Sequence, residues 1–286
     1  MAGELVKSAS YDTTTMAVPS AAELKEQPSR SVFRLLHSSD LHVGDPYQQM
    51  PPGEHLNTCI CPVLAVHNTA ASVGADVILL AGDTFDHPRI HREVIEKVLE
   101  VIAATAFTWI LLPGNHDSWL PDSGALAATA SVPNLHIISR SEGEMVRVRQ
   151  VELGVWGRAL KTHDGQSRPM YGIPARPAWA RWYVVVAHGE YVGCEDFSDP
   201  GRYPPSSPIS DREVAGSSAD YVALGHRHAA EKVVAGAVQC QYSGAPLSLR
   251  GDSRQAVVVT FAARRVVDVD LVAVKRCAGG CGARCE

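Results

Sequence analysis

Five short apolar segments of this chain each end in a group of acidic, histidine or asparagine residues. The segments lie at residues 32–36, 77–81, 107–112, 182–187 and 221–224, and glycine or polar residues follow each one, a pattern that predicts buried strands. Packing gives no reason to place so many polar groups at strand ends, so the pattern predicts a functional site there. In chain order the groups are Asp40-Leu41-His42, Gly82-Asp83, Gly114-Asn115-His116-Asp117, His188-Gly189 and Gly225-His226-Arg227-His228.

The connections between these segments indicate the fold class. Apolar residues with helical spacing occupy residues 56–73 and 91–104, between the first three strands, and this βαβαβ order predicts parallel strands. The second half is rich in valine and is interrupted by Gly, Arg-Arg or Asp rather than by helices, which indicates antiparallel strands at residues 145–155, 233–242 and 256–274. We therefore expect an α/β fold of mixed sheets with flanking helices.

Composition places this fold in one domain. The 286 residues are 45% hydrophobic and 20% charged, as in ordinary globular proteins. No shift in composition divides residues 31–275, which we expect to form one catalytic domain between a disordered tail at residues 1–30 and a Cys- and Gly-containing tail at residues 276–286. The cysteines of the second tail are interpreted as part of a disordered segment, with a thiolate metal site as the alternative. The Pro- and Gly-rich residues 195–208 are interpreted as an insertion rather than a lid.

Charge and targeting signals limit the function classes. The formal net charge of −5 gives no overall basic field, so charge neither indicates nor excludes a nucleic-acid substrate. No apolar run approaches the roughly 20 residues that a membrane-spanning helix requires. Residues 1–30 also lack the apolar core of a signal peptide. We expect a cytoplasmic protein with reduced thiols and no membrane contact.

The polar groups at the strand ends contain the ligand types of divalent metals. Two cations about 3.5 to 4 Å apart need a carboxylate that bridges them, and Asp83 is the predicted bridge. Alternate residues of an extended segment point the same way, so both side chains of Asp-x-His and of His-x-His can reach one site. Mixed nitrogen and oxygen donors suit Mn, Fe or Zn, which leaves the metal open. The predicted ligands of the two ions are Asp40, His42, Asp83, Asn115, His188, His226 and His228.

Residues beside these ligands are predicted to act on the substrate. His116 is the expected proton donor, because an imidazole with a pKa near neutrality suits protonation of a leaving group. Asp117 either orients His116 or is a turn residue. Three arginines are predicted phosphate contacts, with a solvated role as the alternative: Arg89, Arg92 and Arg227. Four further histidines are expected in structural or surface roles: His37, His67, His136 and His163.

Taken in order, these motifs resemble the calcineurin-like metallophosphoesterases. More narrowly, four stretches are similar to the SbcD-type DNA repair exonucleases: His-Ser-Ser-Asp-Leu-His-Val-Gly at residues 37–44, Ala-Gly-Asp-Thr-Phe-Asp at 81–86, Pro-Gly-Asn-His-Asp at 113–117 and Tyr-Ser-Gly-Ala-Pro-Leu-Ser-Leu at 242–249. The resemblance covers about residues 32–275. One departure is Asp86, which stands where some members place a second catalytic histidine.

The resemblance implies a four-layer αββα sandwich, with two mixed sheets flanked by helices. It implies DNA as the substrate, manganese as the usual metal and a coiled-coil ATPase as the partner. Family nucleases continue into a capping domain and a region that binds this ATPase, whereas only the short tail at residues 276–286 follows the last predicted strand here. By the same resemblance, one cation is held by Asp40, His42, Asp83 and His228, and the other by Asp83, Asn115, His188 and His226.

These expectations combine into a dinuclear-metal phosphodiesterase, with a DNA exonuclease or endonuclease as the main hypothesis. The alternative is a phosphodiesterase or phosphatase for a small nucleotide or other phosphoester, which the acidic balance and the short C-terminal segment favour. A non-enzymatic scaffold is a third interpretation. A scaffold has little need for His116 or for a full ligand set, so the presence of both favours an enzyme.

Overall fold

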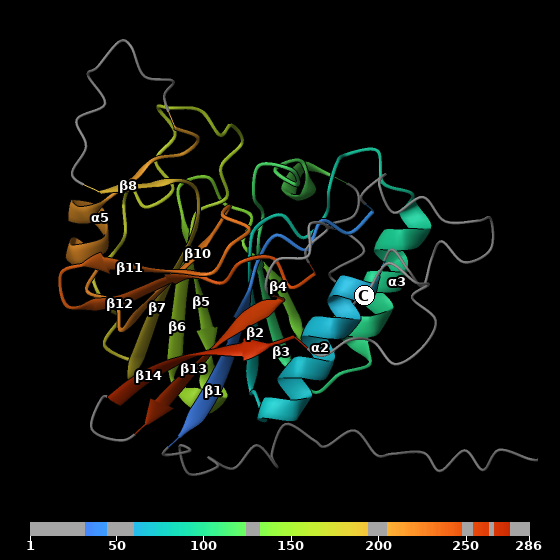
Figure 1. The fold of residues 1–286 in the computed structure, drawn as a ribbon, viewed down its shortest axis with the longest axis horizontal. Coiled ribbons are helices and arrows are strands. Elements are labelled where there is room, and N and C mark those ends of the chain that lie inside the picture. Colours follow the sequence, from blue (N-terminus) through green and yellow to red (C-terminus); the bar gives the residue numbers. More distant parts are fainter. Residues whose placement is uncertain are drawn as a thin grey trace, which may run out of the picture.

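The computed structural model describes residues 32–44, 60–123, 132–193, 205–247, 254–262 and 266–274. Within these ranges two six-stranded sheets pack face to face, and two helices cover the outer face of the first sheet (Figure 1). Both predicted tails, with the three C-terminal cysteines, lie outside the described residues. So does most of the predicted insertion at residues 195–208, of which only residues 205–208 are described.

The first sheet contains the predicted parallel strands. In spatial order its members are β14 (Val266–Ala273), β13 (Gln255–Ala262), β1 (Phe33–Ser38), β2 (Val77–Ala81), β3 (Thr108–Leu112) and β4 (Leu135–Ile137). Strands β1 to β4 are parallel, and β13 pairs antiparallel with both β1 and β14. The crossovers pass through α2 (Cys61–Val73) and α3 (Arg92–Ala103), which confirms the βαβαβ prediction.

The two helices follow from their apolar spacing. On α3, Val94, Val98 and Ile102 recur on one face and are buried against the first sheet. Helix α2 ends at Gly74, whose left-handed φ of 64° stops the helical hydrogen bonding. Among the helices that the structure describes, none has the length and apolar character needed to cross a membrane.

The second sheet is also mixed. Its spatial order is β11 (Glu231–Ala235), β12 (Val238–Tyr242), β10 (Tyr221–Gly225), β7 (Trp182–His188), β6 (Leu153–Gly157) and β5 (Glu144–Val148). The pairs β5–β6 and β11–β12 are antiparallel, as predicted, and so is β13–β14 in the first sheet. The remaining short elements are η1 (Leu120–Asp122), η2 (Arg149–Val151), β8 (Tyr191–Gly193), β9 (Ile209–Ser210) and α5 (Asp211–Gly216).

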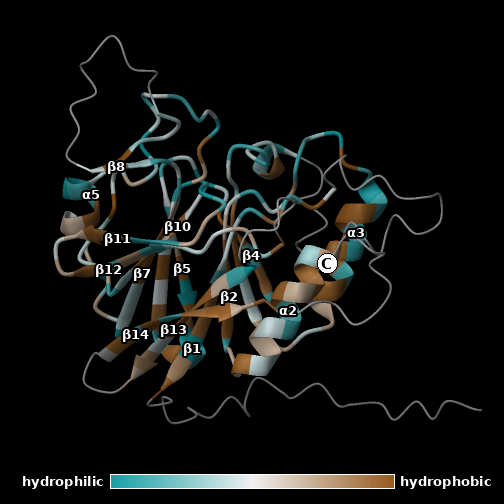
Figure 2. Ribbon diagram, in the orientation of Figure 1, coloured by the Kyte–Doolittle hydropathy of each residue, from teal (hydrophilic) through white to brown (hydrophobic). Residues whose placement is uncertain are grey.

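The core lies between the sheets and on both outer faces. On β2, Val77 and Leu79 pack against the second sheet. The alternate residues Ile78 and Leu80 pack against the helices, because successive side chains of a strand point to opposite faces. Every residue of β2, β7 and β10 is buried, as expected of central strands covered on both faces. Figure 2 shows this hydrophobic interior in the sheets and on α2 and α3, with hydrophilic loops at one end.

The structure confirms two mixed sheets with flanking helices, but the outer layers differ. Helices α2 and α3 cover the first sheet, whereas the second is covered by the six-residue helix α5 and by residues 158–181, which are irregular. Three prolines and two glycines in that segment explain why it is not helical. Its Met170 is buried against the second sheet. Strand β4, the β8–β9 pair and α5 were not predicted, because each is short and lacks a sustained period.

Candidate metal centre

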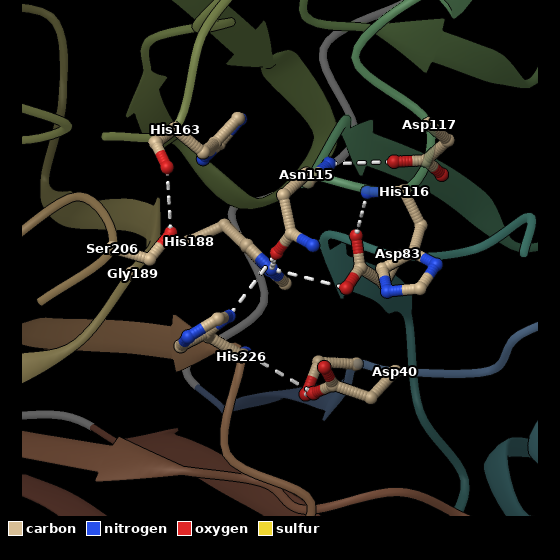
Figure 3. A network of polar contacts seen from close by, with 12 residues as sticks. Asp40, Asp83, Asn115, His116, Asp117, His163, His188, Gly189, Ser206 and His226 are labelled. Atoms are coloured by element: carbon tan, nitrogen blue, oxygen red, sulfur yellow. Dashed lines mark hydrogen bonds and ion pairs between the residues drawn. The ribbon is translucent and has the colours of Figure 1, made fainter. Parts of the chain in front are cut away.

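All seven predicted ligands lie at one edge of the two sheets. They lie just after the carboxyl ends of β1, β2 and β3 in the first sheet and of β10 in the second, except His188, which is the last residue of β7. Backbone hydrogen bonds align the first two loops: the amides of Asp40 and His42 donate to the carbonyls of Gly82 and Asp83, each at 3.0 Å. Between the sheets, the His226 amide donates to Oδ2 of Asp40 at 3.2 Å (Figure 3).

One group of ligand atoms comes from Asp40, His42 and His228. Nε2 of His42 lies 3.3 Å from Nε2 of His228, which lies 3.9 Å from Oδ1 of Asp40. That Asp40 oxygen is buried and has no hydrogen-bond partner among the described residues. Burying a carboxylate oxygen without a partner is costly, and a cation in this position would offset that cost.

A second group comes from Asn115, His188 and His226. Oδ1 of Asn115 lies 3.0 Å from Nε2 of His188 and 3.1 Å from Nδ1 of His226 (Figure 3). Nδ1 of His188 donates to the carbonyl of Ala81 at 2.9 Å, so Nε2 is the nitrogen directed at the site. Burial lowers the pKa of His226, and the nearby His188 lowers it further, which favours the neutral imidazole that binds metals.

Asp83 lies between the two groups. Its Oδ2 is 3.3 Å from Nε2 of His188 and 4.0 Å from Nε2 of His42, while Oδ1 accepts a hydrogen bond from the His116 amide at 2.9 Å. Burial alone would raise the pKa of Asp83, but His188 and the His116 amide hold it well below its usual range. The side chain is therefore an anion that lies between the two groups of predicted ligands.

The loops that present these ligands have unusual backbone geometry. Left-handed conformations are rare in residues other than glycine, cost about 1–3 kcal/mol each and concentrate at functional sites. At position 82 glycine is required by lack of space, because a Cβ atom there would lie 2.0 Å from Nδ1 of His188. Four of the seven ligands have a left-handed φ: Asp40 (55°), His42 (46°), Asp83 (52°) and His226 (106°).

The donor set fits divalent metal ions. It offers three oxygen donors and four imidazole nitrogens, and neighbouring ligand atoms lie 3.0 to 4.0 Å apart. Such separations suit atoms that each lie about 2.0–2.2 Å from a shared cation. Three overlapping groups of acids and histidines have ligand atoms within 4.8 Å of one another: Asp40–His42–His228, Asp40–Asp83–His188 and His42–Asp83–His116.

His116 lies beside this donor set, with its ring edge-on to His42 and the centroids 4.6 Å apart. Its Nδ1 donates to the carbonyl of Asp86 at 2.6 Å, which leaves Nε2 to exchange a proton with a substrate. The carboxylate of Asp86 accepts a hydrogen bond from Nδ1 of His42 at 2.9 Å. Asp86 therefore orients His116 through its backbone and His42 through its side chain.

Comparison with known proteins identifies the family. Residues 33–230 match the family model described as calcineurin-like phosphoesterase. The chain belongs to this family. It is therefore a metal-dependent phosphoesterase, which confirms the resemblance seen in its motifs. The SbcD component of the nuclease SbcCD from Escherichia coli strain K12 is 24% identical over 287 residues, covering 83% of this chain and 67% of that protein. The same component from Escherichia coli O157:H7 gives the same values.

Solved structures of phosphoesterases also align with this family member. YfcE, a phosphoesterase from E. coli, aligns with a TM-score of 0.37 and 16% identity, over 85% of this chain and all (100%) of that one. A novel archaeal phosphodiesterase aligns with a TM-score of 0.40 and 9% identity, over 84% of this chain and 100% of that one.

In this calcineurin-like phosphoesterase the side chain of Asp117 is directed at backbone amides. Oδ2 accepts hydrogen bonds from the amides of Thr84 at 2.8 Å and Phe85 at 3.1 Å, and Oδ1 accepts from Gly114 at 2.6 Å. Asp117 is completely buried, and burial together with a neighbouring carboxylate raises its pKa to about 6. These contacts join the loops after β2 and β3 and do not include the ring of His116.

The three arginines predicted to contact phosphate differ in their surroundings. Arg227 is bound by Glu190. Arg92 donates to Glu96 one turn along α3 at 2.7 Å, with 87% of its side chain exposed. Arg89 is exposed in the loop before α3. Among the described residues, no hydrogen bond or ion pair joins these three side chains to the seven predicted ligands.

His163 lies at the edge of the site, although it was expected in a structural or surface role. Its ring is nearly perpendicular to that of His188, with centroids 5.9 Å apart. Its Nδ1 lies 2.9 Å from Oγ of Ser207, and its carbonyl accepts a hydrogen bond from Oγ of Ser206 at 3.0 Å (Figure 3). Burial and the nearby His188 lower its pKa to about 4. No strand end or paired ligand in the sequence marks this residue.

The other three histidines have the structural or surface surroundings expected of them. His37 is buried in β1, with Nδ1 2.8 Å from the hydroxyl of Tyr221. His67 packs edge-on against Phe107, and His136 pairs with a glutamate at 2.7 Å.

Proposed function

We propose that this phosphoesterase is a dinuclear-metal phosphodiesterase that cleaves DNA as an exonuclease or endonuclease. The observation that supports a dinuclear site is the position of Asp83, whose Oδ2 lies 3.3 Å from one ligand group at His188 and 4.0 Å from the other at His42. A single ion would not use ligand groups on both sides of this carboxylate. When bound, the two cations supply charge stabilisation at the phosphoryl oxygens and activate the attacking water.

The chain's own residues divide into two sets under this proposal. The nitrogen and oxygen donors suit Mn, Fe or Zn, and we propose Mn because of the resemblance to the SbcD-type nucleases. The first cation is assigned to Asp40, His42, Asp83 and His228, and the second cation to Asp83, Asn115, His188 and His226. Asp83 therefore belongs to both sets of ligands and fixes the separation between them.

His116 is the proposed proton donor to the leaving oxygen. Because its Nδ1–H is bound to the Asp86 carbonyl at 2.6 Å, the proton that it exchanges is the one on Nε2. The side chain is 42% exposed, so a substrate can reach it. A general acid of this kind contributes about 10²- to 10⁴-fold to the rate. We propose that Asp117 supports this step indirectly, by holding the loops that carry His116 and Asp83.

The choice of DNA rests on similarity. The relatives with 24% identity are components of a nuclease and match over 83% of this chain, and the motif at residues 242–249 resembles the same branch. As those relatives belong to a multi-chain nuclease, we further propose a coiled-coil ATPase as the partner. Arg227, Arg89 and Arg92 were predicted to contact the phosphates, but the acidic partners of Arg227 and Arg92 weaken that assignment.

One set of observations favours a second substrate class. The net charge is −5, and two of the three arginines predicted to contact phosphate are paired with glutamates. DNA binding depends strongly on unpaired cations that contact phosphates, whereas a small phosphodiester or phosphomonoester does not need an extended basic surface. A small nucleotide is therefore the alternative substrate.

The test uses metal-free protein supplemented with Mn²⁺, and it compares single-stranded DNA, duplex DNA and bis-p-nitrophenyl phosphate. We expect cleavage of at least one DNA together with the small diester. Turnover of the small diester alone would favour the second substrate class, and no turnover of any of the three would contradict the proposed function.

A His116→Asn variant controls for contaminating nuclease. Metal binding should persist, since none of the seven assigned ligands is removed, and turnover should fall by about two to four powers of ten. Undiminished turnover would show that His116 is not the acid.

A further inference from the structure

The guanidinium of Arg227 is engaged by neighbouring groups at all three nitrogens. Nε and Nη2 both donate to Oε1 of Glu190, the first at 3.1 Å, and Nη2 also donates to the carbonyl of Tyr191 at 3.0 Å. Nη1 donates to Glu231. The planar group lies over the ring of Tyr242, 5.1 Å from its centroid. A substrate phosphate would have to displace these partners, so the structure gives Arg227 a different task.

Glu190 connects this arginine to an assigned metal ligand. Its Oε2 lies 3.9 Å from Nε2 of His226, while Nδ1 of the same ring faces Oδ1 of Asn115 at 3.1 Å. The 3.9 Å separation is that of an ion pair rather than a hydrogen bond, and loss of a carboxylate partner that orients a metal-binding imidazole commonly weakens metal binding by about 10- to 100-fold. The Glu190 and Arg227 side chains are 31% and 28% exposed, so water screens their ion pair only in part.

Tyr242 fixes the backbone on both sides of Glu190. Its hydroxyl donates to the carbonyl of Gly189 at 2.8 Å and accepts from the amide of Tyr191 at 2.7 Å. The side chain is completely buried in β12. One phenol therefore holds the turn that follows His188 and supports the arginine with the face of its ring.

We propose that Glu190, Arg227 and Tyr242 form a positioning unit that joins the loops after β7 and β10 and sets the affinity for the second cation. The inference rests on the proposed dinuclear function. The unit acts through His188 and His226 and contacts no substrate. Losing it weakens binding of the second ion and leaves the first, which is held mainly by the first sheet.

The principal test measures Mn²⁺ binding to metal-free protein by calorimetry and follows the spin-coupled Mn pair by electron paramagnetic resonance. Glu190→Gln keeps the side-chain shape and removes the charge beside His226. We expect the second dissociation constant to rise by about 10- to 100-fold and the coupled signal to fall accordingly. The matched control is Glu231→Gln, which removes the negative charge of the other acidic partner of Arg227. The carboxylate beside His226 stays in place in this variant. Its second dissociation constant should change by less than about threefold.

Two further variants test the other members. Arg227→Lys keeps the charge but loses the planar fork that holds Glu190 and the Tyr191 carbonyl together, so it should also weaken the second site. Tyr242→Phe removes only the hydroxyl and should have the same direction of effect. The Glu190→Gln and Arg227→Lys losses should be less than additive, because both changes break one unit. Circular dichroism and urea unfolding confirm that each variant is folded.

The outcomes separate this inference from the proposed function. Wild-type protein that binds two ions, together with Glu190→Gln and Arg227→Lys proteins that bind them equally well, would overturn the positioning unit alone. A higher KM for the diester in Arg227→Lys, with unchanged metal affinity, would make Arg227 a substrate contact and also overturn it. Wild-type protein that fails to bind a second ion would overturn both the dinuclear function and this inference.

Discussion

The two halves of the metal centre are held in place by different means. In the first sheet, backbone amides and carbonyls join the loops after β1 and β2, and the buried carboxylate of Asp117, in the loop after β3, accepts three further amides. In the second sheet one backbone hydrogen bond, from the Gly189 amide to the Gly225 carbonyl, joins the ends of β7 and β10, and side chains hold the loops beyond it, through Glu190 with Arg227 and through His163 with Ser207. Changes in the first half should therefore lower the free energy of unfolding, whereas changes in the second should mainly loosen a metal site in a folded protein.

The largest effect is expected where the first half is broken. Asp117→Ala leaves three amides without their acceptor in a completely buried site. Each unsatisfied buried group costs about 1–3 kcal/mol, so the free energy of unfolding should fall by roughly 3 kcal/mol or more. Urea denaturation of the metal-free protein measures this loss.

Asp122→Ala is the matched control for that change. Asp122 is an exposed residue whose carboxylate pairs with Lys161 at 3.0 Å, and such surface pairs contribute about 0–1 kcal/mol. Equal urea midpoints for the two variants would show that the Asp117 contacts do not stabilise the first half.

A smaller effect is expected where the two halves meet. His37 of β1 faces the Tyr221 hydroxyl of β10, and burial lowers the pKa of His37 to about 3, although the Leu224 carbonyl opposes the shift. The unfolded chain binds this proton near its ordinary pKa of about 6.5, so the stabilisation is complete above that pH and is lost as the pH falls toward 3. Between pH 7 and pH 5 the His37 contribution should fall by roughly 2 kcal/mol.

Urea unfolding of metal-free protein at both pH values measures this loss. His37→Gln keeps an acceptor for Tyr221 but does not titrate in this range, so its stability should change less between the two pH values than that of the wild type. Identical pH dependence in both proteins would show that His37 does not carry the effect.

The same comparison explains how much the sequence could predict. The first half could be predicted from the sequence because its ligands follow strands β1, β2 and β3 of a βαβαβ unit. Functional sites generally form at the edge of a sheet where parallel strands end. The run at residues 77–81 matches β2 in full. The seven predicted ligands lie at one edge of the sheets because each is at or just after the end of a strand with a clear apolar run.

The second half could be predicted less well, because the residues that hold its ligands in place are far apart in the sequence. His163 lies in an irregular segment, and its contacts with Ser207 and His188 connect residues 44 apart and 25 apart in the chain. Arg227 could be placed beside the site, but its pairing with Glu190 depends on how β7 and β10 align. For Asp117 the sequence predicts either an orienting or a turn role, because it does not tell which backbone amides a carboxylate will reach.

Replacement of His163 is expected to change the free energy of binding the second cation by about 1 kcal/mol. His163→Ala removes the edge-on packing against His188 and the contact with Ser207, each worth about 0.5–1.5 kcal/mol. Because these contacts support a proposed ligand of the second half, we expect the second Mn²⁺ dissociation constant to rise several-fold while the protein remains folded. Calorimetry on the metal-free protein measures both dissociation constants.

His67→Ala serves as the control for that variant, because His67 packs edge-on against Phe107 with centroids 5.6 Å apart but lies on α2. Removing it should leave both metal affinities unchanged. If His163→Ala leaves them unchanged as well, the His163 contact is only a packing contact.

The smallest effect is expected from Arg92, at the exposed start of helix α3, which covers the first sheet. Arg92 is 87% exposed and pairs with Glu96 on the same helix, an arrangement that contributes about 0.3–0.5 kcal/mol. Arg92→Ala should therefore leave stability, metal affinity and KM for DNA nearly unchanged. Steady-state cleavage of duplex DNA at low and moderate salt provides the measurement, because a lost phosphate contact would raise KM and reduce its salt dependence. A several-fold rise in KM with unchanged metal affinity would instead place Arg92 on the DNA path, and would give the first half a substrate role beyond holding metal.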